Sequence, residues 1–424
     1  MKKIYLLIIT FFLLFSSQEA DAQFWKKKEP PPKKKPVPVK PKEPVKAPPK
    51  KKTRDIEYPK TVIKDRYRID VLLPLYLDEL VKDSKPVSKD YIPEKSQNAV
   101  NFYEGMKLAA DTLTKLGYNI DLYVHDITQK ELAPDVLIKG DVLAESDLII
   151  GALQSYQIKP LANYAAKRKV NLVSILSPAD AGVMNNPFFT ITQPTLITHI
   201  KKLRAEVLKK YPDQKIHLFY RTNPSIDSAA YRYTFEDAEK RFDKLLINTL
   251  PDYARLSPLF DSAGTNVIMM PVLDYNYAQS VIEQLYYLFP SYRFEVIGLP
   301  SWKSMASLRK ADAFPNTAVS ISTPFNFDMN SPSITNVAKA YKNSYAGKIN
   351  ETALRGYESL MWYAYLLKRY GTVFNEKMKD NSVSFTKYQI SPQWTESNDL
   401  MYNENTRYYI YHYQGGSFSV SDNL

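Results

Sequence analysis

The chain has 424 residues, enough to bury the cores of two or three domains, and it contains no cysteine. The lack of cysteine excludes disulfides, thiolate catalysis, iron–sulfur clusters and zinc sites built on thiolates. The formal net charge is +12, but residues 23–64 carry 15 Lys and Arg against 4 Asp and Glu. The chain from residue 65 onward is therefore close to neutral, which argues against nucleic-acid binding by the folded part.

Residues 1–22 have the pattern of a secretory signal peptide. Two lysines precede an apolar run from Ile4 to Phe15, and the small residues Ala20 and Ala22 mark a cleavage site. A retained membrane anchor is the alternative, but the apolar run is short for a transmembrane helix. We therefore expect a mature protein in the periplasm, and we expect no lipoprotein because the lipid-attachment cysteine is missing.

Residues 23–64 form a stretch rich in lysine and proline. This stretch holds ten prolines and has no apolar period, which predicts a disordered linker that is partly polyproline II. It is either a solvated spacer or a polybasic arm that contacts anionic envelope polymers or lipid headgroups.

Beyond the linker, apolar runs typical of buried strands alternate with segments of helical period. Expected strands cover residues 67–75, 119–126, 148–150, 172–176, 188–191, 215–220, 266–270, 294–299 and 318–322. Expected helices cover residues 96–117, 134–145, 194–210, 228–246, 274–288, 301–310, 334–345 and 353–370, with a further helix ending at 168. Residues 385–390, 406–413 and 417–420 read as a short C-terminal β coda.

This alternation predicts an α/β protein with two lobes, each a parallel sheet with helices on both faces. We expect residues 65–191 with 323–372 to form lobe 1, and residues 192–322 with 373–424 to form lobe 2.

The most informative stretch runs from Asp147 to Asp180. Its first apolar run stops at Gly151, a helix follows, and a second apolar run ends at Ser177-Pro178. This pattern indicates a parallel β-α-β unit. The turns after its two strands are polar and would lie together at the carboxyl ends of neighbouring strands, where open α/β sheets bind ligands.

The sequence contains none of the common catalytic, metal-binding or nucleotide-binding motifs. The four histidines are widely spread, and no nucleophile elbow, zinc helix, phosphate loop or dinucleotide fingerprint occurs. We therefore expect no catalytic residues, no metal, no cofactor and no enzymatic activity. Tyr76, Tyr275 and Trp302 each follow an expected strand, and aromatic side chains at strand ends suit a recognition cleft.

From about Tyr67 to Tyr370 the chain resembles the type I periplasmic binding proteins, the family of the Leu/Ile/Val receptors of ABC importers. The resemblance rests on five stretches taken in their joint order: residues 101–117, 124–129, 147–180, 186–195 and 338–371. It implies two lobes that close by hinge motion on a small polar ligand.

The resemblance also implies roles for single residues. Gln154 and Ser155 match the helix N-terminus that receives a ligand carboxylate. The remaining matches are Pro178, Ala179 and Asp180 in a second ligand loop, Tyr76 after the first strand, and Tyr275 and Trp302 on the opposite lobe.

The chain departs from the family's pattern in two places. Residues 195–198 and 299–302 hold no acid where amino-acid receptors place a partner for the ligand ammonium. A buried ammonium without a carboxylate is costly, which argues against ordinary amino-acid transport.

Two functions fit the sequence. The first is a solute receptor that binds a small polar molecule and delivers it to an ABC permease. The second is an envelope interaction protein of the same fold, because outer-membrane activators of peptidoglycan synthases also use that fold.

Overall fold

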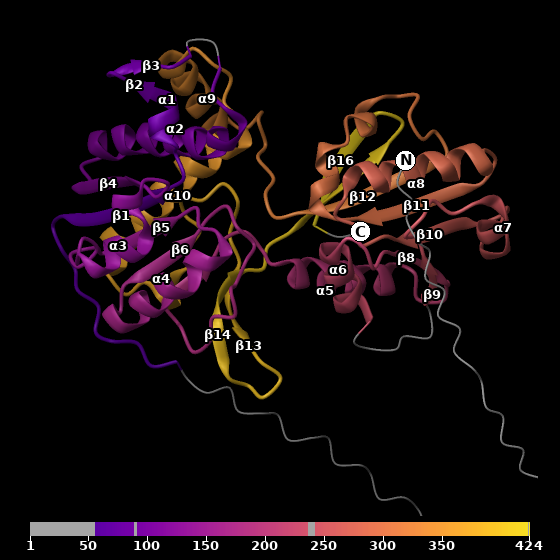
Figure 1. Cartoon of the computed structure of the whole chain (residues 1–424), viewed down its shortest axis with the longest axis horizontal. Helices are drawn as coiled ribbons and strands as arrows, with labels where there is room; N and C mark the ends of the chain where they lie inside the picture. The colour runs from indigo at the N-terminus through magenta and orange to yellow at the C-terminus, as the bar shows by residue number, and fades with distance from the viewer. Residues whose placement is uncertain (1–55, 89–90, 236–241, 423) are drawn as a thin grey trace, which may run out of the picture. The chain divides into compact units, whose positions relative to one another are not determined.

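The computed structural model describes residues 56–88, 91–235, 242–422 and 424. The expected signal peptide, 1–22, and residues 23–55 of the expected linker lie outside this part. The described chain contains two seven-stranded sheets, here the first sheet and the second sheet (Figure 1). Both are mostly parallel, which confirms the predicted α/β fold. No helix in the described ranges is long and apolar enough to cross a membrane.

The first sheet has the strand order β13-β14-β7-β6-β5-β1-β4. Its strands are β1 (Tyr67–Leu73), β4 (Ile120–Asp126), β5 (Leu148–Gly151), β6 (Asn171–Ser174), β7 (Phe189–Ile191), β13 (Ile390–Trp394) and β14 (Leu400–Asn405). All neighbours pair in parallel except β13, which runs antiparallel to β14. The strands β5, β6 and β7 are buried along their whole length, as their mostly apolar character predicts, although Asn171, Ser174 and Thr190 interrupt it in β6 and β7.

Helices cover both faces of the first sheet. These helices are α2 (Glu94–Lys115), α3 (Pro134–Lys139), α4 (Ser155–Arg168), α9 (Pro332–Tyr345) and α10 (Glu351–Tyr370). Ile69 of β1 packs in one core cluster with α2 and α10, whereas its near neighbour Leu72 packs in another with α4. The alternation of side chains along a strand explains this division.

The helices α2 and α10 cross at two glycines. A Cβ added to Gly105 would lie 1.9 Å from the carbonyl oxygen of Ala353, and one added to Gly356 would lie 2.0 Å from that of Phe102. Any larger side chain would push the helices apart. The crossing therefore fixes α10 closely against α2.

The second sheet has the strand order β16-β15-β12-β11-β10-β8-β9. Its strands are β8 (Ile216–Tyr220), β9 (Phe242–Leu246), β10 (Thr265–Met269), β11 (Arg293–Gly298), β12 (Thr317–Thr323), β15 (Tyr409–Gln414) and β16 (Ser417–Ser421). The helices in this half are α5 (Leu196–Lys210), α6 (Ser225–Phe235), α7 (Tyr253–Leu256) and α8 (Tyr275–Leu288). The strands β15 and β16 are antiparallel additions to an otherwise parallel sheet.

Shorter elements complete the described chain. After β1, the helix α1 (Leu77–Leu80) leads into a small hairpin of β2 (Val81–Lys82) and β3 (Lys85–Pro86). Short 3₁₀ turns are η1 (Lys130–Leu132), η2 (Ser257–Leu259), η3 (Pro300–Ser304), η4 (Ala306–Arg309) and η5 (Asn375–Lys377).

Two predicted helices are wrong in part. Of the helix expected over 228–246, the described part runs to Phe235, and Phe242–Leu246 is instead a strand parallel to β8. The burial of Phe242–Leu246 alternates in the manner of an edge strand with one solvated face. The helix expected over 301–310 consists of two 3₁₀ turns.

The predicted β coda is not a separate element. Its strands over 406–413 and 417–420 correspond to β15 and β16, which extend the edge of the second sheet. The strand expected over 385–390 is wrong except at Ile390, and β13 and β14, which extend the edge of the first sheet, were not predicted. The prediction that all of 373–424 accompanies the second sheet is therefore wrong for residues 390–405, and also for Phe374, Met378 and Tyr388, which pack in a core cluster with β1, α2 and α10. The physical reason is pairing, because β14 bonds in parallel to β7.

Part of the predicted linker is ordered against the body. The Thr61 hydroxyl donates to the Tyr370 carbonyl at 2.8 Å, and the Thr372 N–H donates to the Val62 carbonyl at 3.0 Å. The Lys64 ammonium pairs with Asp147 at 2.7 Å. The prediction of disorder is thus wrong for residues 56–64, because their backbone finds hydrogen-bond partners at the end of α10.

Candidate functional site

The predicted ligand residues of the first sheet follow three neighbouring strands. The strands β6, β5 and β1 pair side by side and in parallel, so their carboxyl ends lie at one edge. We call this edge, with the residues that follow it, the first edge. It carries six of the predicted residues, namely Tyr76 after β1, Gln154 and Ser155 after β5, and Pro178, Ala179 and Asp180 after β6. The fold thus gathers residues far apart in sequence at the place where parallel sheets bind ligands.

The helix α4 starts at the first edge. Gln154 is its N-cap, and the Gln154 N–H donates to the Gln157 side-chain oxygen at 2.9 Å. The side chains of Gln154 and Ser155 are exposed. Of the N–H groups in the first helical turn, that of Gln157 donates to the Gln154 carbonyl at 2.9 Å, which leaves those of Ser155 and Tyr156 without a partner among the described residues; the helix dipole is positive at this end. The arrangement can accept an anionic group.

The loop after β6 is joined to the end of β5. The Ile175 N–H donates to the Gly151 carbonyl at 3.0 Å. Farther along, both carboxylate oxygens of Asp180 are engaged, one with the Tyr402 hydroxyl at 2.9 Å and the other with the Gly182 N–H at 3.0 Å. In this conformation the Asp180 carboxylate ties the first edge to β14.

Tyr76 lies on the side of the first edge nearest β4. Its backbone is left-handed, with φ at 55°, and the Asp126 carboxylate accepts from the N–H groups of Tyr76 and Leu77. The Lys95 ammonium sits 4.7 Å from the centre of the Tyr76 ring. Tyr76 therefore offers a ring that already carries a cation on one face.

The two residues predicted for the second sheet have different surroundings. Tyr275 is the first residue of α8, directly after β10 and its loop, and is partly buried. Trp302 is fully buried at 0% exposure, and its indole N–H donates to the Val272 carbonyl at 2.7 Å. Its ring fills the space beside Gly298, where an added Cβ would lie 2.2 Å from it. The prediction that Trp302 contacts a ligand is corrected, since its side chain is core.

Sequence reasoning missed an acid at the crossover between the sheets. Glu404 of β14 is 1% exposed and accepts from the N–H of Thr195 at 2.7 Å and from its hydroxyl at 3.0 Å. Burial raises the pKa of Glu404, although the hydrogen bonds from Thr195 and Thr198 oppose that rise. No local pattern marks this acid, because it lies 209 positions from Thr195.

Arg355 of α10 was also missed. Its guanidinium donates to the Ile175 carbonyl at the first edge and lies 3.9 Å from the centre of the Phe325 ring. Within the described part of the chain it forms no ion pair with a carboxylate. Burial lowers the pKa of Arg355. A charged residue within the apolar run around Leu354 and Tyr357 was the sequence signal for it.

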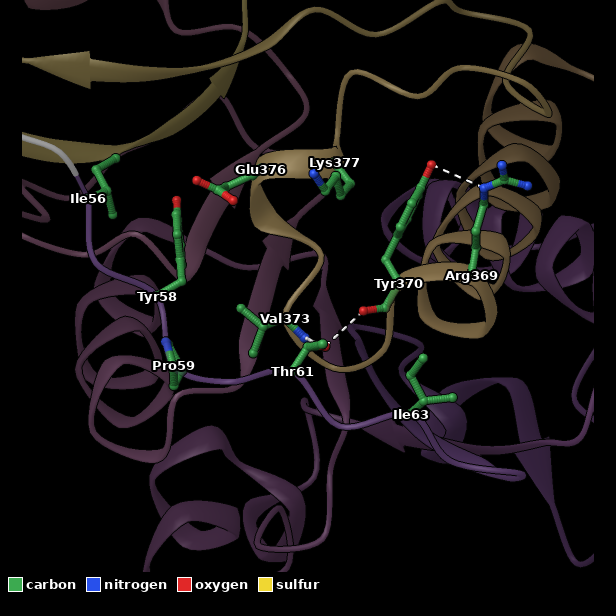
Figure 2. A pocket seen from close by; sticks show the side chains of 10 residues that line it. All are labelled: Ile56, Tyr58, Pro59, Thr61, Ile63, Arg369, Tyr370, Val373, Glu376 and Lys377. Carbon is green, nitrogen blue, oxygen red and sulfur yellow. Dashed lines mark hydrogen bonds between the residues drawn. The ribbon is translucent and has the colours of Figure 1, made fainter.

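A cavity lies elsewhere, where the ordered segment 56–63 crosses the end of α10. It has a volume of about 570 Å³ and is shown in Figure 2, with Thr61 bonded to the Tyr370 main chain. Burial raises the pKa of Tyr58 to about 12; a bond to Asn403 opposes this rise, and the facing Glu376 carboxylate adds to it. None of the eight predicted ligand residues lines this cavity.

The described residues hold no cluster of three or more His, Asp or Glu side chains that could bind a metal ion. The chemistry on offer at the first edge is hydrogen bonding and charge, namely helix N–H groups, exposed hydroxyl and amide side chains, and one guanidinium. These groups can bind and orient a polar molecule.

Comparisons with known proteins place the fold. No family model matches the sequence, and no curated protein matches it. A solved structure of a putative branched-chain amino acid ABC transporter from Rhodospirillum rubrum matches 84% of this chain and 100% of its own, with a TM-score of 0.60 and 13% identity. An ABC transporter substrate-binding protein from Desulfitobacterium hafniense, solved with leucine, matches the same shares with a TM-score of 0.54 and 14% identity.

A third similar structure is full-length LpoA from Haemophilus influenzae. It matches 85% of this chain but only 60% of its own length, with a TM-score of 0.55 and 12% identity. At these identities the likeness concerns the fold alone, and proteins with different names share it. The chain has the fold of the type I periplasmic binding proteins.

Proposed function

We propose that the protein is an extracytoplasmic binding protein that holds a small polar molecule at the first edge. The observation that carries this proposal is the gathering of Gln154, Ser155 and the 178–180 loop at the carboxyl ends of adjacent parallel strands. The exposed N-terminus of α4 supplies donors there, and the fold is one that closes around ligands by hinge motion. The protein acts without catalysis.

Export to the periplasm is part of the proposal, and it rests on the signal-peptide pattern of residues 1–22. An ABC permease would be the partner of such a receptor. The eight residues proposed for ligand contact reduce to seven, since Trp302 is buried in the core. Tyr275 is the proposed contact from the second sheet.

A thermal-shift screen of residues 23–424 against amino acids, short peptides, sugars and cell-wall fragments tests this function. We expect a clear hit whose affinity falls at least about 10-fold in Ser155→Ala, because the exposed Ser155 hydroxyl would lose its bond to the ligand. The matched control is Ser333→Ala, the same change in the first turn of α9, which should bind normally. A hit unaffected by Ser155→Ala would refute the location, and the absence of any hit would refute the function.

A second candidate is an envelope interaction protein, favoured by the likeness to LpoA and by the ordered segment 56–64. That segment fixes the point at which the Lys/Pro-rich arm leaves the body, which suits an arm that contacts anionic envelope polymers. Retention on purified envelopes is the test. It should fall with added salt and vanish when residues 23–55 are deleted, whereas equal retention without the arm would reject this role.

A further inference from the structure

Arg355 lies at the first edge with most of its hydrogen-bonding capacity unused. A guanidinium has five N–H groups. Within residues 56–88, 91–235 and 242–422, the Arg355 guanidinium donates to one acceptor, the Ile175 carbonyl. Its face rests on the Phe325 ring, which is itself 1% exposed. The stacking fixes the direction of the side chain without consuming its N–H groups.

The position of Arg355 relates it directly to the proposed ligand site. Ile175 is the residue after β6, and its own N–H donates to the carbonyl of Gly151, the last residue of β5. The helix α4 begins four residues after Gly151 at Ser155. The guanidinium therefore lies where the ends of β5 and β6 meet, at the strands whose loops carry the proposed ligand residues.

The carboxylates that interact electrostatically with Arg355 form their hydrogen bonds and ion pairs with other residues. Glu351, one helical turn earlier, forms an ion pair with Lys303. Glu358 accepts from the Ser384 hydroxyl at 2.7 Å and from Thr386. The Arg355 guanidinium is partly buried and bonds to neither carboxylate, so an added anion would be attracted to it.

Groups that could instead hold a ligand ammonium are occupied. The Asp180 carboxylate is taken by Tyr402 and by a backbone N–H. Glu404 is 1% exposed and is held by Thr195. The local balance of free polar groups thus favours negative charge over positive charge in the ligand.

We infer that the ligand carries an anionic group, a carboxylate or a phosphate, which Arg355 binds, and that the ligand needs no ammonium group. This inference rests on the proposed function and names its substrate class. The planar fork of the guanidinium suits bidentate contact with either kind of oxyanion. The proposed ligands are small organic acids or phosphate compounds. The ammonium group of an ordinary amino acid would add nothing to its binding affinity.

The test is a titration series on residues 23–424. For each common amino acid, the intact compound is compared with its deaminated carboxylate and with its amide, and inorganic phosphate is titrated alongside. We expect a carboxylate or phosphate to bind at least as tightly as the intact amino acid, and every amide to bind weakly. Comparing the affinities for the carboxylates with the affinity for phosphate shows which anionic group the site prefers.

Variants assign the effect to Arg355. We expect Arg355→Gln to weaken the best anion at least about 30-fold, the loss typical of a broken buried charge pair. Arg355→Lys keeps the charge without the fork and should retain part of the affinity, which covers the case in which the Gln variant does not fold. Arg369→Gln, in the same helix with a side chain 60% exposed, is the control and should bind normally.

The outcomes separate this inference from the proposed function. Binding that requires the ammonium, or anion binding that survives both Arg355 variants, overturns the inference while leaving the binding function in place. Failure of every compound, phosphate included, overturns both.

Discussion

Substituting Gly356 by alanine should destabilise the protein, although the same change in an exposed helix would stabilise it. In α10 the added methyl group would lie 2.0 Å from the carbonyl oxygen of Phe102 in α2. A carbon and an oxygen that are not bonded need more than 3 Å, so the two helices would have to separate by about 1 Å or more. The obstacle is backbone, which cannot turn aside as a side chain can.

The magnitude follows from two opposing effects. Overpacking of a rigid contact costs about 3 kcal/mol at the upper end of its usual range. The higher helix propensity of alanine stabilises the helix by about 1 kcal/mol relative to glycine. We therefore expect the free energy of unfolding to fall by about 2 kcal/mol in Gly356→Ala.

Urea unfolding followed by tryptophan fluorescence measures this change, because Trp362 lies in the same helix and is fully buried. The control is Gly347→Ala, where the added Cβ would meet ordinary contacts of 3.7 Å and stability should hardly change. An unchanged or raised midpoint in Gly356→Ala would refute the close crossing of α2 and α10.

Three further predictions concern single side chains. Trp302→Phe should lower the free energy of unfolding by about 1 to 3 kcal/mol through the lost indole hydrogen bond, yet leave titrated ligand affinity unchanged; a selective loss of affinity would reinstate Trp302 as a ligand contact. Thr61→Val should increase hydrogen exchange and proteolysis of residues 56–64 without shifting the main melting transition, and unchanged protection would show that the Thr61 bonds do not hold the segment. Burial lowers the pKa of His199 to about 4, and the nearby Lys202 ammonium adds to this effect, so the folded state favours the neutral ring. The neutral ring should thus contribute fully to the free energy of unfolding above about pH 6.5, and up to about 3 kcal/mol of that contribution should be lost as the pH falls towards 4. Thermal melting at several pH values should show a smaller loss of stability in acid for His199→Gln than for the wild type. An equal loss in both proteins would contradict the role given to His199.

The sequence predicted the fold well because buried parallel strands leave a strong trace. The run 148–150 is apolar throughout and stops at Gly151, and the run 172–176 is apolar except for Ser174 and ends at Ser177-Pro178. The strand β9 was missed because Phe242–Leu246 continued an apparent helical period, and its pairing with β8 overrode that local preference. Pairing with β7 likewise decided that β14 belongs to the first sheet.

The candidate site was predicted in part. The first edge followed from the order of strands and turns, since the carboxyl ends of neighbouring parallel strands must meet. Trp302 was misjudged because an aromatic residue after a strand can turn inward as readily as outward, and only packing decides. Arg355 and Glu404 were missed because their partners, Ile175 and Thr195, lie far away in sequence.

Hydrogen exchange of residues 23–424, with and without the tightest-binding carboxylate or phosphate of the titration panel, tests the central claim most directly. The account predicts that the anion slows exchange in residues 151–156 and 175–180 and in the turn of α10 around Arg355. Slowing confined to residues 56–63 and 369–377, around the cavity of Figure 2, would place the ligand there and contradict binding at the first edge.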